Sequence, residues 1–266
     1  STVDTVNLSL PQRFLSTGHQ LSRTVRHDLV DLTPQQIRVV LNNLARLNPG
    51  PFGGTFEVRE VGGVQVAVVR FGEVKMPARI LMIHGGGFAF GSSRTHRALA
   101  VHLAKATGCE VWIPDYALSP ENPFPAGLND VLSIYERLII DVGDVIVVGD
   151  SAGGNLAMAL VQQAIQRGWE RPAGLALLSP WLDLRPDSES NRKNEANLSP
   201  FDRKDMCTYA DFYRGDIDTS DPRISPILGG TEGFPPTHLQ FSEVEFLYHD
   251  TVALQANLNK SRIPVE

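Results

Sequence analysis

Short apolar runs alternating with amphipathic stretches constrain this chain most. Runs rich in Val, Ile and Leu predict strands, and stretches with apolar residues at helical spacing predict helices. Strands that are apolar throughout are buried on both faces, as in a parallel sheet. We therefore predict an α/β fold with a mostly parallel, doubly wound sheet. The predicted strands are Ala78–Ile83, Cys109–Pro114, Asp144–Val148 and Gly174–Leu178, and the helices between them are Thr95–Thr107, Ala126–Ile140 and Ser151–Arg167.

Segments on either side extend this core. Two strand-like runs flank Gly62-Gly63, which predicts a β-hairpin and an antiparallel edge of the sheet. Residues 183–215 interrupt the alternation with Pro, Ser, Asn and charged residues, and we interpret them as an insertion above the sheet. The further predicted elements are the strands Phe56–Glu60, Val64–Phe71 and His238–Phe241 and the helices Arg203–Tyr213 and Asp250–Asn259.

The first 51 residues predict a helical cap. Thr33 is a suitable N-cap, with Pro34 at the first helical position and Gln36 completing a capping box. The helix that follows has one apolar face, formed by Ile37, Val40, Leu41, Leu44 and Leu47. Because this segment is too short to enclose its own core, we divide the chain into a cap or lid, residues 1–51, and a core, residues 52–266.

Composition excludes several classes of protein. The formal net charge is −6 and the 24 basic residues are scattered, which argues against nucleic acid as a partner. Cys109 and Cys207 stand far apart without a neighbouring cysteine, so they build neither a disulfide framework nor a zinc site. The apolar runs are too short to cross a bilayer, and no signal peptide is recognisable. We expect a cytoplasmic protein without stable membrane association, and the sequence leaves open whether it forms a homodimer.

The segment Gly149–Gly153 fits the pattern G-x-S-x-G between a predicted strand and a predicted helix. In that context the serine occupies a tight turn that lifts its hydroxyl above the sheet, and glycine neighbours permit the strained backbone. Ser151 is therefore the candidate nucleophile. The alternative interpretation is a phosphate-binding turn or an ordinary strand-to-helix junction.

A glycine-rich loop, His84–Gly87, follows the predicted strand that ends at Ile83. Glycines leave backbone N–H groups accessible, and such donors stabilise the oxyanion of a tetrahedral intermediate. We predict an oxyanion hole formed by the N–H groups of Gly85, Gly86 and Ala152. Phe88 and Phe90 follow the loop and are candidate walls of an acyl-binding pocket, while His84 is expected to anchor the loop through its backbone.

Several motifs in this order resemble the hormone-sensitive-lipase family of α/β-hydrolase esterases, over a stretch from about Ala78 to the end of the chain. The motifs are His84–Gly87, Gly149–Gly153, Asp115–Glu121, Phe124–Ala126 and Ser179–Leu184. The resemblance implies an α/β-hydrolase fold. It also implies structural roles, at the oxyanion loop and the strand ends, for Asp115, Tyr116, Asp130, Trp181 and Asp183.

The same resemblance indicates the acid of a catalytic triad. The family carries it in a Gly-x-x-Asp/Glu-x-Leu segment, which Ser242–Leu247 matches with Ser in place of Gly and Glu in place of Asp. Glu245 is therefore the candidate, and a carboxylate there holds the tautomer of the catalytic histidine. Asp250 and Glu243 are the alternatives.

The histidine is not found where this fold places it. In the chain order Ser, acid, His, the base follows the next strand, which is predicted to begin at Ile263. Its loop then falls beyond Glu266, so we expect a chain that lacks the last strand and helix. His249 is too close to Glu245 in sequence, and His96 and His238 are interpreted as packing or surface residues.

These observations predict a serine carboxylesterase that hydrolyses small to medium acyl esters through an acyl-enzyme, with no metal or organic cofactor. The cap and the insertion 183–215 are expected to select the ester. The alternative is an inactive small-molecule receptor on the same fold, similar to the plant gibberellin receptors, which lack the histidine.

Overall fold

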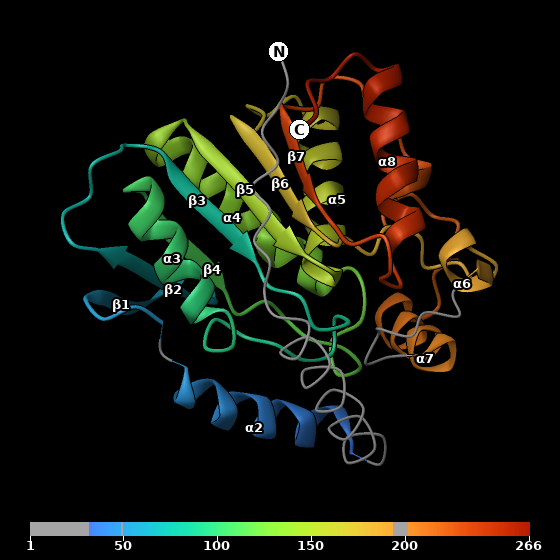
Figure 1. Cartoon of the computed structure of the whole chain (residues 1–266), viewed down its shortest axis with the longest axis horizontal. Helices are drawn as coiled ribbons and strands as arrows, with labels where there is room; N and C mark the ends of the chain where they lie inside the picture. The colour runs from blue at the N-terminus through green and yellow to red at the C-terminus, as the bar shows by residue number, and fades with distance from the viewer. Residues whose placement is uncertain (1–31, 49, 194–201) are drawn as a thin grey trace.

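The computed structural model describes residues 32–48, 50–193 and 202–266. Within these ranges, strands β1 to β7 form one sheet in the order β1-β2-β4-β3-β5-β6-β7 (Figure 1). The strands are β1 Gly54–Val61, β2 Val64–Phe71, β3 Arg79–Ile83, β4 Glu110–Pro114, β5 Val145–Asp150, β6 Gly174–Leu178 and β7 Thr237–Gln240. The helices are α2 Pro34–Leu44, η1 Ala45–Leu47, α3 Arg97–Thr107, α4 Ala126–Val142, α5 Ala152–Gln166, α6 Glu189–Lys193, α7 Arg203–Arg214, η2 Pro226–Leu228 and α8 Tyr248–Lys260.

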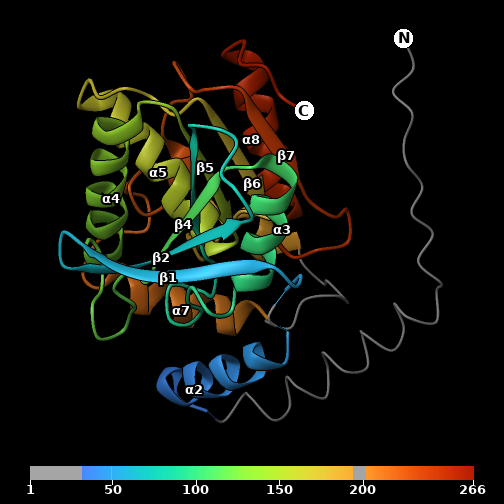
Figure 2. The same ribbon diagram turned by 90° about the vertical axis from the view of Figure 1, so that its left-hand side faces the viewer.

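The pairing of the strands confirms the predicted architecture. β1 and β2 form an antiparallel hairpin at one edge, visible across the front of Figure 2, and β2 pairs antiparallel with β4. All other neighbouring strands, from β4 through β3, β5 and β6 to β7, are parallel. The carboxyl ends of β3 and β5 therefore meet at the same edge, which is where ligand sites of such sheets lie.

Helices cover both faces of the sheet. Leu81 and Ile83 of β3 pack into a large apolar cluster with residues of α4, α5 and α8, whereas Ile80 and Met82 pack into a smaller cluster with α3. Successive strand residues point to opposite faces, so the continuous apolar run of β3 serves both clusters. Figure 2 shows α4 and α5 on one side of the sheet and α3 on the other.

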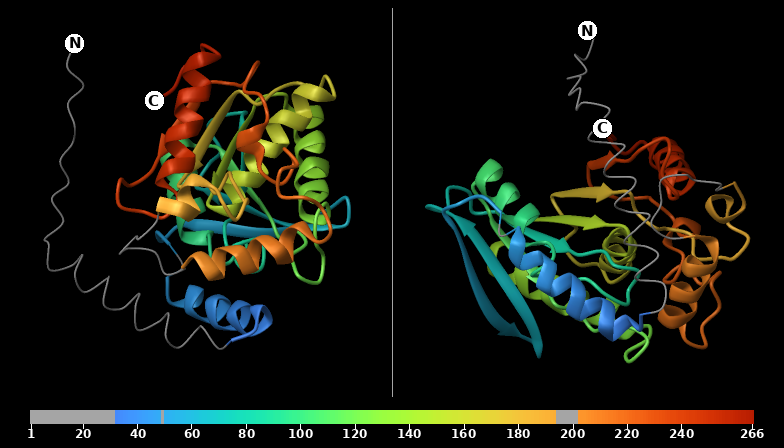
Figure 3. Two further views of the ribbon diagram at one scale, coloured as in Figure 1. Left: turned by 90° about the vertical axis from the view of Figure 1, so that its right-hand side faces the viewer. Right: turned by 60° about the horizontal axis from the view of Figure 1, so that its bottom comes forward.

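The cap helix α2 begins as predicted and lies below the carboxyl ends of the strands, beside α7 (Figure 3). Its predicted apolar face is only partly used: Ile37 packs against Ala89 and Phe90, but Leu44 and Leu47 are 51% and 82% exposed. Residues 1–31 and 49 of the predicted cap lie outside the described residues, so its extent stays a prediction.

Helix α6 and the end of the chain can be compared with the elements predicted from the sequence. Helix α6 was not predicted, because its five residues carry no apolar periodicity. After Ile263 the chain pairs with β7 as expected: the N–H of Thr237 donates to the carbonyl of Pro264 at 2.9 Å, and Val265 bridges Thr237 in parallel. In the part of the chain that is described, no helix is long and apolar enough to cross a membrane.

Candidate active site

Ser151 stands at the junction between β5 and α5, as the G-x-S-x-G pattern predicts. Its backbone has φ 51° and ψ −120°, a region that residues other than glycine rarely adopt. The turn is tight enough to require its glycines: a Cβ on Gly153 would lie 2.0 Å from the carbonyl oxygen of Ile83, and one on Gly149 would lie 2.4 Å from that of Gly153. The geometry is that of a nucleophile elbow.

The segment after β6 holds the elbow in place. The N–H of Ser151 donates to the carbonyl of Leu178 at 3.0 Å, and the N–H of Trp181 donates to the carbonyl of Ser151 at the same distance. Both backbone groups of the serine are therefore fixed. Ala152, the next residue, is the first of α5, so its N–H lies at the electropositive end of that helix.

In the glycine loop after β3, one of the predicted oxyanion donors, Gly85, is wrong. The N–H of Gly85 donates to Oδ1 of Asp150 at 3.0 Å, so this donor is occupied and does not point to an oxyanion. Among the described residues, the N–H groups of Gly86 and Gly87 have no acceptor. Gly86 has φ +124°, and a Cβ there would meet the carbonyl oxygen of Phe90 at 2.1 Å. The free donors of this loop are thus Gly86 and Gly87.

The carboxylate that holds Gly85 also pairs with a histidine. Nε2 of His96 lies 3.1 Å from Oδ1 of Asp150. Burial lowers the pKa of His96, but the hydrogen bond and charge of Asp150 outweigh it and leave that pKa above its usual range. Burial raises the pKa of Asp150, and His96 reverses this, so the net pKa is lowered. His96, which was predicted to be a packing or surface residue, is therefore hydrogen-bonded to Asp150, the residue next to the nucleophile.

His84 anchors the loop as predicted. Its Nδ1 lies 2.9 Å from the carbonyl oxygen of Gly85, and its ring stacks on Tyr116 with ring centroids 4.3 Å apart. Burial and the neighbouring His96 lower the pKa of His84 to about 3, so the imidazole is neutral at ordinary pH. A neutral, buried ring that is committed to a backbone carbonyl does not serve as a general base.

Other polar groups fasten the same region, in the roles implied by the family resemblance. The hydroxyl of Tyr116 donates to the carbonyl of His84 at 2.8 Å. Asp115 accepts from both the N–H and the hydroxyl of Ser93. Asp130 accepts from the N–H of Ala117 at 2.8 Å. These bonds tie the loops after β3 and β4 to each other and to α4.

The predicted acid, Glu245, lies in the loop between β7 and α8. Its Oε2 accepts from the hydroxyl of Ser179 at 2.7 Å. Its Oε1 is buried and has no hydrogen-bond partner among the described residues. Buried carboxylate oxygens are nearly always paired, so this oxygen is available to a donor such as an imidazole N–H.

The two alternative acids differ from Glu245 in this respect. Asp250 is buried, and both of its oxygens are used: Oδ2 accepts from the N–H groups of Leu182 and Asp183, and Oδ1 accepts from the hydroxyl of Ser190. Burial raises the pKa of Asp250 to about 7, against the effect of these hydrogen bonds. Glu243 is exposed. Of the three, Glu245 is the one with a buried carboxylate oxygen that has no hydrogen-bond partner among the described residues.

No histidine within residues 32–48, 50–193 and 202–266 is hydrogen-bonded to Ser151 or Glu245. His84 and His96 have the partners given above. Nδ1 of His249 lies 3.8 Å from Oε1 of Glu189, which turns it toward α6. His102 and His238 are exposed on α3 and β7. The sequence contains two more histidines, His19 and His27, which lie outside the described residues.

The two predicted pocket residues behave differently. Phe88 is 1% exposed and stacks on Tyr213 with ring centroids 3.7 Å apart, so it belongs to the core; this corrects its predicted role as a pocket wall. Phe90 packs under Ile37 of α2 and meets Tyr209 of α7 edge-on at 5.4 Å. It therefore lies where the cap helix covers the oxyanion loop. The positions of Phe88 and Phe90 in the sequence did not show which of them would lie in the core.

Neither a metal-binding group nor a disulfide occurs among the residues that the structure describes. They contain no cluster of three or more His, Cys, Asp or Glu side chains that could hold an ion. Cys109 and Cys207 are free thiols.

Comparison with known proteins identifies the family. A family model described as the alpha/beta hydrolase fold matches residues 80–266. The chain belongs to this family. An esterase of Acinetobacter venetianus is 35% identical over 95% of this chain and 85% of its own length. An acetyl-hydrolase of Streptomyces hygroscopicus is 35% identical over 70% of this chain and 63% of its own length.

Solved structures agree with the family assignment. An esterase from the bacterial hormone-sensitive lipase family superposes with a TM-score of 0.85 at 29% identity, covering 93% of this chain and 86% of that one. A hormone-sensitive lipase from a metagenome library gives 0.86 at 32% identity, covering 93% and 85%. These findings confirm the predicted resemblance to the hormone-sensitive-lipase family.

Proposed function

We propose that this member of the α/β-hydrolase family is a serine carboxylesterase acting on small to medium acyl esters through an acyl-enzyme. The observation that carries the proposal is the strained Ser151 between the N–H of Ala152 and a glycine loop with unpartnered N–H groups. Such an arrangement suits a hydroxyl that attacks a carbonyl and donors that hold the resulting oxyanion.

The proposed reaction assigns a step to each group. Oγ of Ser151 attacks the ester carbonyl, while the imidazole of a histidine, which the described residues do not supply and Oε1 of Glu245 would hold, accepts the hydroxyl proton. The oxyanion receives hydrogen bonds from Gly86, Gly87 and Ala152. The histidine then protonates the leaving alkoxide, and water, activated by the same base, releases the acid and restores Ser151.

The relatives described above are named as an esterase, an acetyl-hydrolase and lipases, which supports hydrolysis over a receptor function. The proposal keeps to the general class of small to medium acyl esters, because parts of the predicted lid, residues 1–51, and of the predicted insertion, residues 183–215, lie outside the described residues.

The test compares the chain with Ser151→Ala, using p-nitrophenyl acetate and butyrate with and without added imidazole, together with a fluorophosphonate probe. Since no described histidine is bonded to Glu245, we expect slow turnover that imidazole accelerates in the parent chain. Ser151→Ala is expected to remove that acceleration and the fluorophosphonate adduct. Equal rates for both chains under all conditions, with no adduct on Ser151, would refute the esterase and favour the receptor.

We further propose a cytoplasmic location, on the composition, and a small-molecule ester as the substrate, on the geometry around Ser151. A homodimer is tested by the mass of the protein in light scattering. A mass of one chain across the micromolar range rejects it.

A further inference from the structure

A cavity of about 560 Å³ lies apart from the candidate active site. It is open to solvent and is lined mainly by residues of η1, the hairpin β1–β2 and the start of α3. None of Ser151, Glu245 and the oxyanion glycines lines it. Its most prominent feature is the set of basic side chains around it, which are Arg46, Arg94 and Arg97.

These arginines differ from others on the described surface. Arg38, Arg59 and Arg70, for example, each form an ion pair with a glutamate. Neither Arg46, Arg94 nor Arg97 has a carboxylate within salt-bridge distance in the described ranges. Like charges around one cavity repel each other, and an anion placed between them relieves that repulsion.

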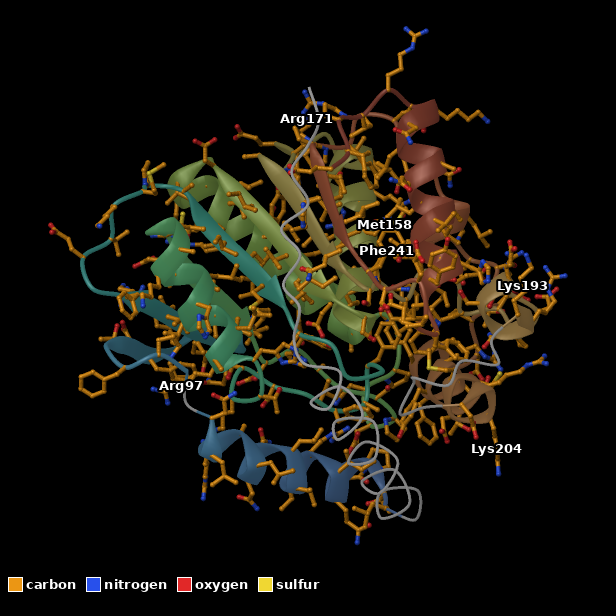
Figure 4. All side chains as sticks on the ribbon, in the orientation of Figure 1. Arg97, Met158, Arg171, Lys193, Lys204 and Phe241 are labelled. Carbon is orange, nitrogen blue, oxygen red and sulfur yellow. The ribbon has the colours of Figure 1, made fainter. Side chains whose placement is uncertain are left out.

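Arg97 supplies an independent indication. It is the first residue of α3, and Figure 4 shows it on the side of α3 that faces α2. Its Nε is buried and has no acceptor among the described residues, although the guanidinium lies 4.7 Å above the ring of Phe56. Stacking fixes the plane of the guanidinium and leaves its N–H donors without an acceptor. A buried guanidinium donor without an acceptor is unusual.

One acidic residue also lines the cavity, but it is already engaged. Oδ1 of Asp115 accepts from the N–H of Ser93 at 2.6 Å, and Oδ2 accepts from its hydroxyl at 2.9 Å. Asp115 therefore makes no ion pair with the arginines, and one carboxylate faces three guanidinium groups. The balance of charge in the cavity remains positive.

Part of the lining beside these charges is apolar. Phe56 and Val58 alternate along β1, so their side chains share one face of the strand, and both line the cavity. A ligand that fits must therefore carry a negative head for the arginines and an apolar part for β1.

We propose that this cavity binds a small organic anion, with a phosphate, phosphonate or carboxylate head on Arg97, Arg94 and Arg46 and an apolar group against Phe56 and Val58. Guanidinium groups recognise these planar or tetrahedral oxyanions through paired N–H donors. The site is separate from Ser151, so it does not depend on the proposed esterase activity.

The test is isothermal titration calorimetry of the chain with phenylphosphonate and benzoate, which share the ring and differ in the head. Inorganic phosphate and benzyl alcohol are the matched probes that lack the ring or the charge. We expect at least one of the two aromatic anions to bind in the micromolar to millimolar range and more tightly than either control. Arg97→Gln is expected to weaken binding about tenfold, the usual size of one charge-assisted hydrogen bond.

The control variant is Arg137→Gln, which removes the same charge from an exposed i,i+4 pair on α4. It should bind as the parent chain does, and Ser151→Ala should as well. Circular dichroism of Arg97→Gln verifies that the variant is folded. Absence of binding by both anions, equal binding of benzyl alcohol, or equal weakening by Arg137→Gln would each overturn the proposal. Equal affinity for inorganic phosphate would overturn the role given to Phe56 and Val58.

Discussion

The carboxylates on the two sides of the candidate active site differ in their hydrogen-bond partners. On the nucleophile side, Asp150 is bonded to His96, whose pKa it raises, and to the N–H of Gly85. On the acid side, Asp250 has only neutral donors, and Glu245 keeps one buried oxygen unpaired. The nucleophile side is therefore a closed network, whereas the acid side retains an acceptor.

The difference matches what each side has to do during hydrolysis. An oxyanion hole works best when its donors are fixed before the reaction, because no reorganisation is then needed. A triad acid, in contrast, needs an oxygen that is free to hold another side chain. Asp150 fixes the loop by occupying Gly85, and this leaves the next two N–H groups of the loop for the substrate.

The largest effect on activity is expected from a substitution that adds a side chain between the glycine loop, His84–Gly87, and Asp150. In Gly85→Ala, the added Cβ would lie 2.3 Å from Oδ2 of Asp150, so the loop must shift. We expect the imidazole-dependent hydrolysis of p-nitrophenyl butyrate to fall about 10²- to 10³-fold, as when an oxyanion donor is lost. Gly174→Ala is the control, because its Cβ would meet nothing closer than 3.9 Å. A rate within threefold of the parent would contradict a fixed loop.

The second-largest effect is expected on the free energy of unfolding. Asp150→Asn removes the charge that pairs with His96, and breaking a partly buried ion pair is expected to cost about 3 kcal/mol in urea unfolding. The pKa of His96 is raised by Asp150 after burial lowers it, so the pair stabilises the fold below the ordinary pKa of histidine. That contribution is lost as the pH rises through the raised pKa. The cost of the variant should shrink at alkaline pH, and a constant cost would show that the charge is not involved.

A smaller effect is expected at the acid. Glu245→Gln keeps a hydrogen bond to Ser179 but replaces the charge that stabilises an imidazolium. We expect imidazole to accelerate ester hydrolysis about tenfold less than in the parent, with the urea midpoint nearly unchanged. Glu243→Gln, at an exposed position, is the control. If both variants respond to imidazole as the parent does, Glu245 is not the acid.

The sequence predicted the framework of this comparison but not its detail. The strand and helix pattern located β3, β5 and α5 within two residues, because burial on both faces leaves a continuous apolar run. The motifs located Ser151 and the glycine loop, because only glycine fits such close backbone contacts. Which of the N–H groups of Gly85, Gly86 and Gly87 is hydrogen-bonded depends on where Asp150 lies in the fold. The spacing of these residues in the sequence does not show this.

The corrected residues share one physical reason. Phe88 and Phe90 are two positions apart in the same loop, yet one stacks on Tyr213 in the core and the other packs under α2. The pairing of His96 with Asp150 joins residues 54 positions apart, brought together by the parallel order of β3 and β5. Long-range packing decides such contacts. The one local signal was His96 at the start of a helix beside the loop.

The smallest effect is expected from the second buried aspartate, which sharpens the contrast with Asp150. Burial raises the pKa of Asp250 to about 7, so the folded state binds a proton that the unfolded state releases near its ordinary pKa of 3.8. Stability should therefore fall as the pH rises between these values. In Asp250→Asn, the amide oxygen can accept from Leu182 and Asp183 and the amide nitrogen can donate to Ser190. We expect this variant to lie within about 1 kcal/mol of the parent at pH 5, where Asp250 is protonated in the fold, and to lack that part of the slope in urea unfolding from about pH 4 to 8. A loss as large as that of Asp150→Asn, or an unchanged slope, would mean that Asp250 is charged in the fold and that the two aspartates are alike.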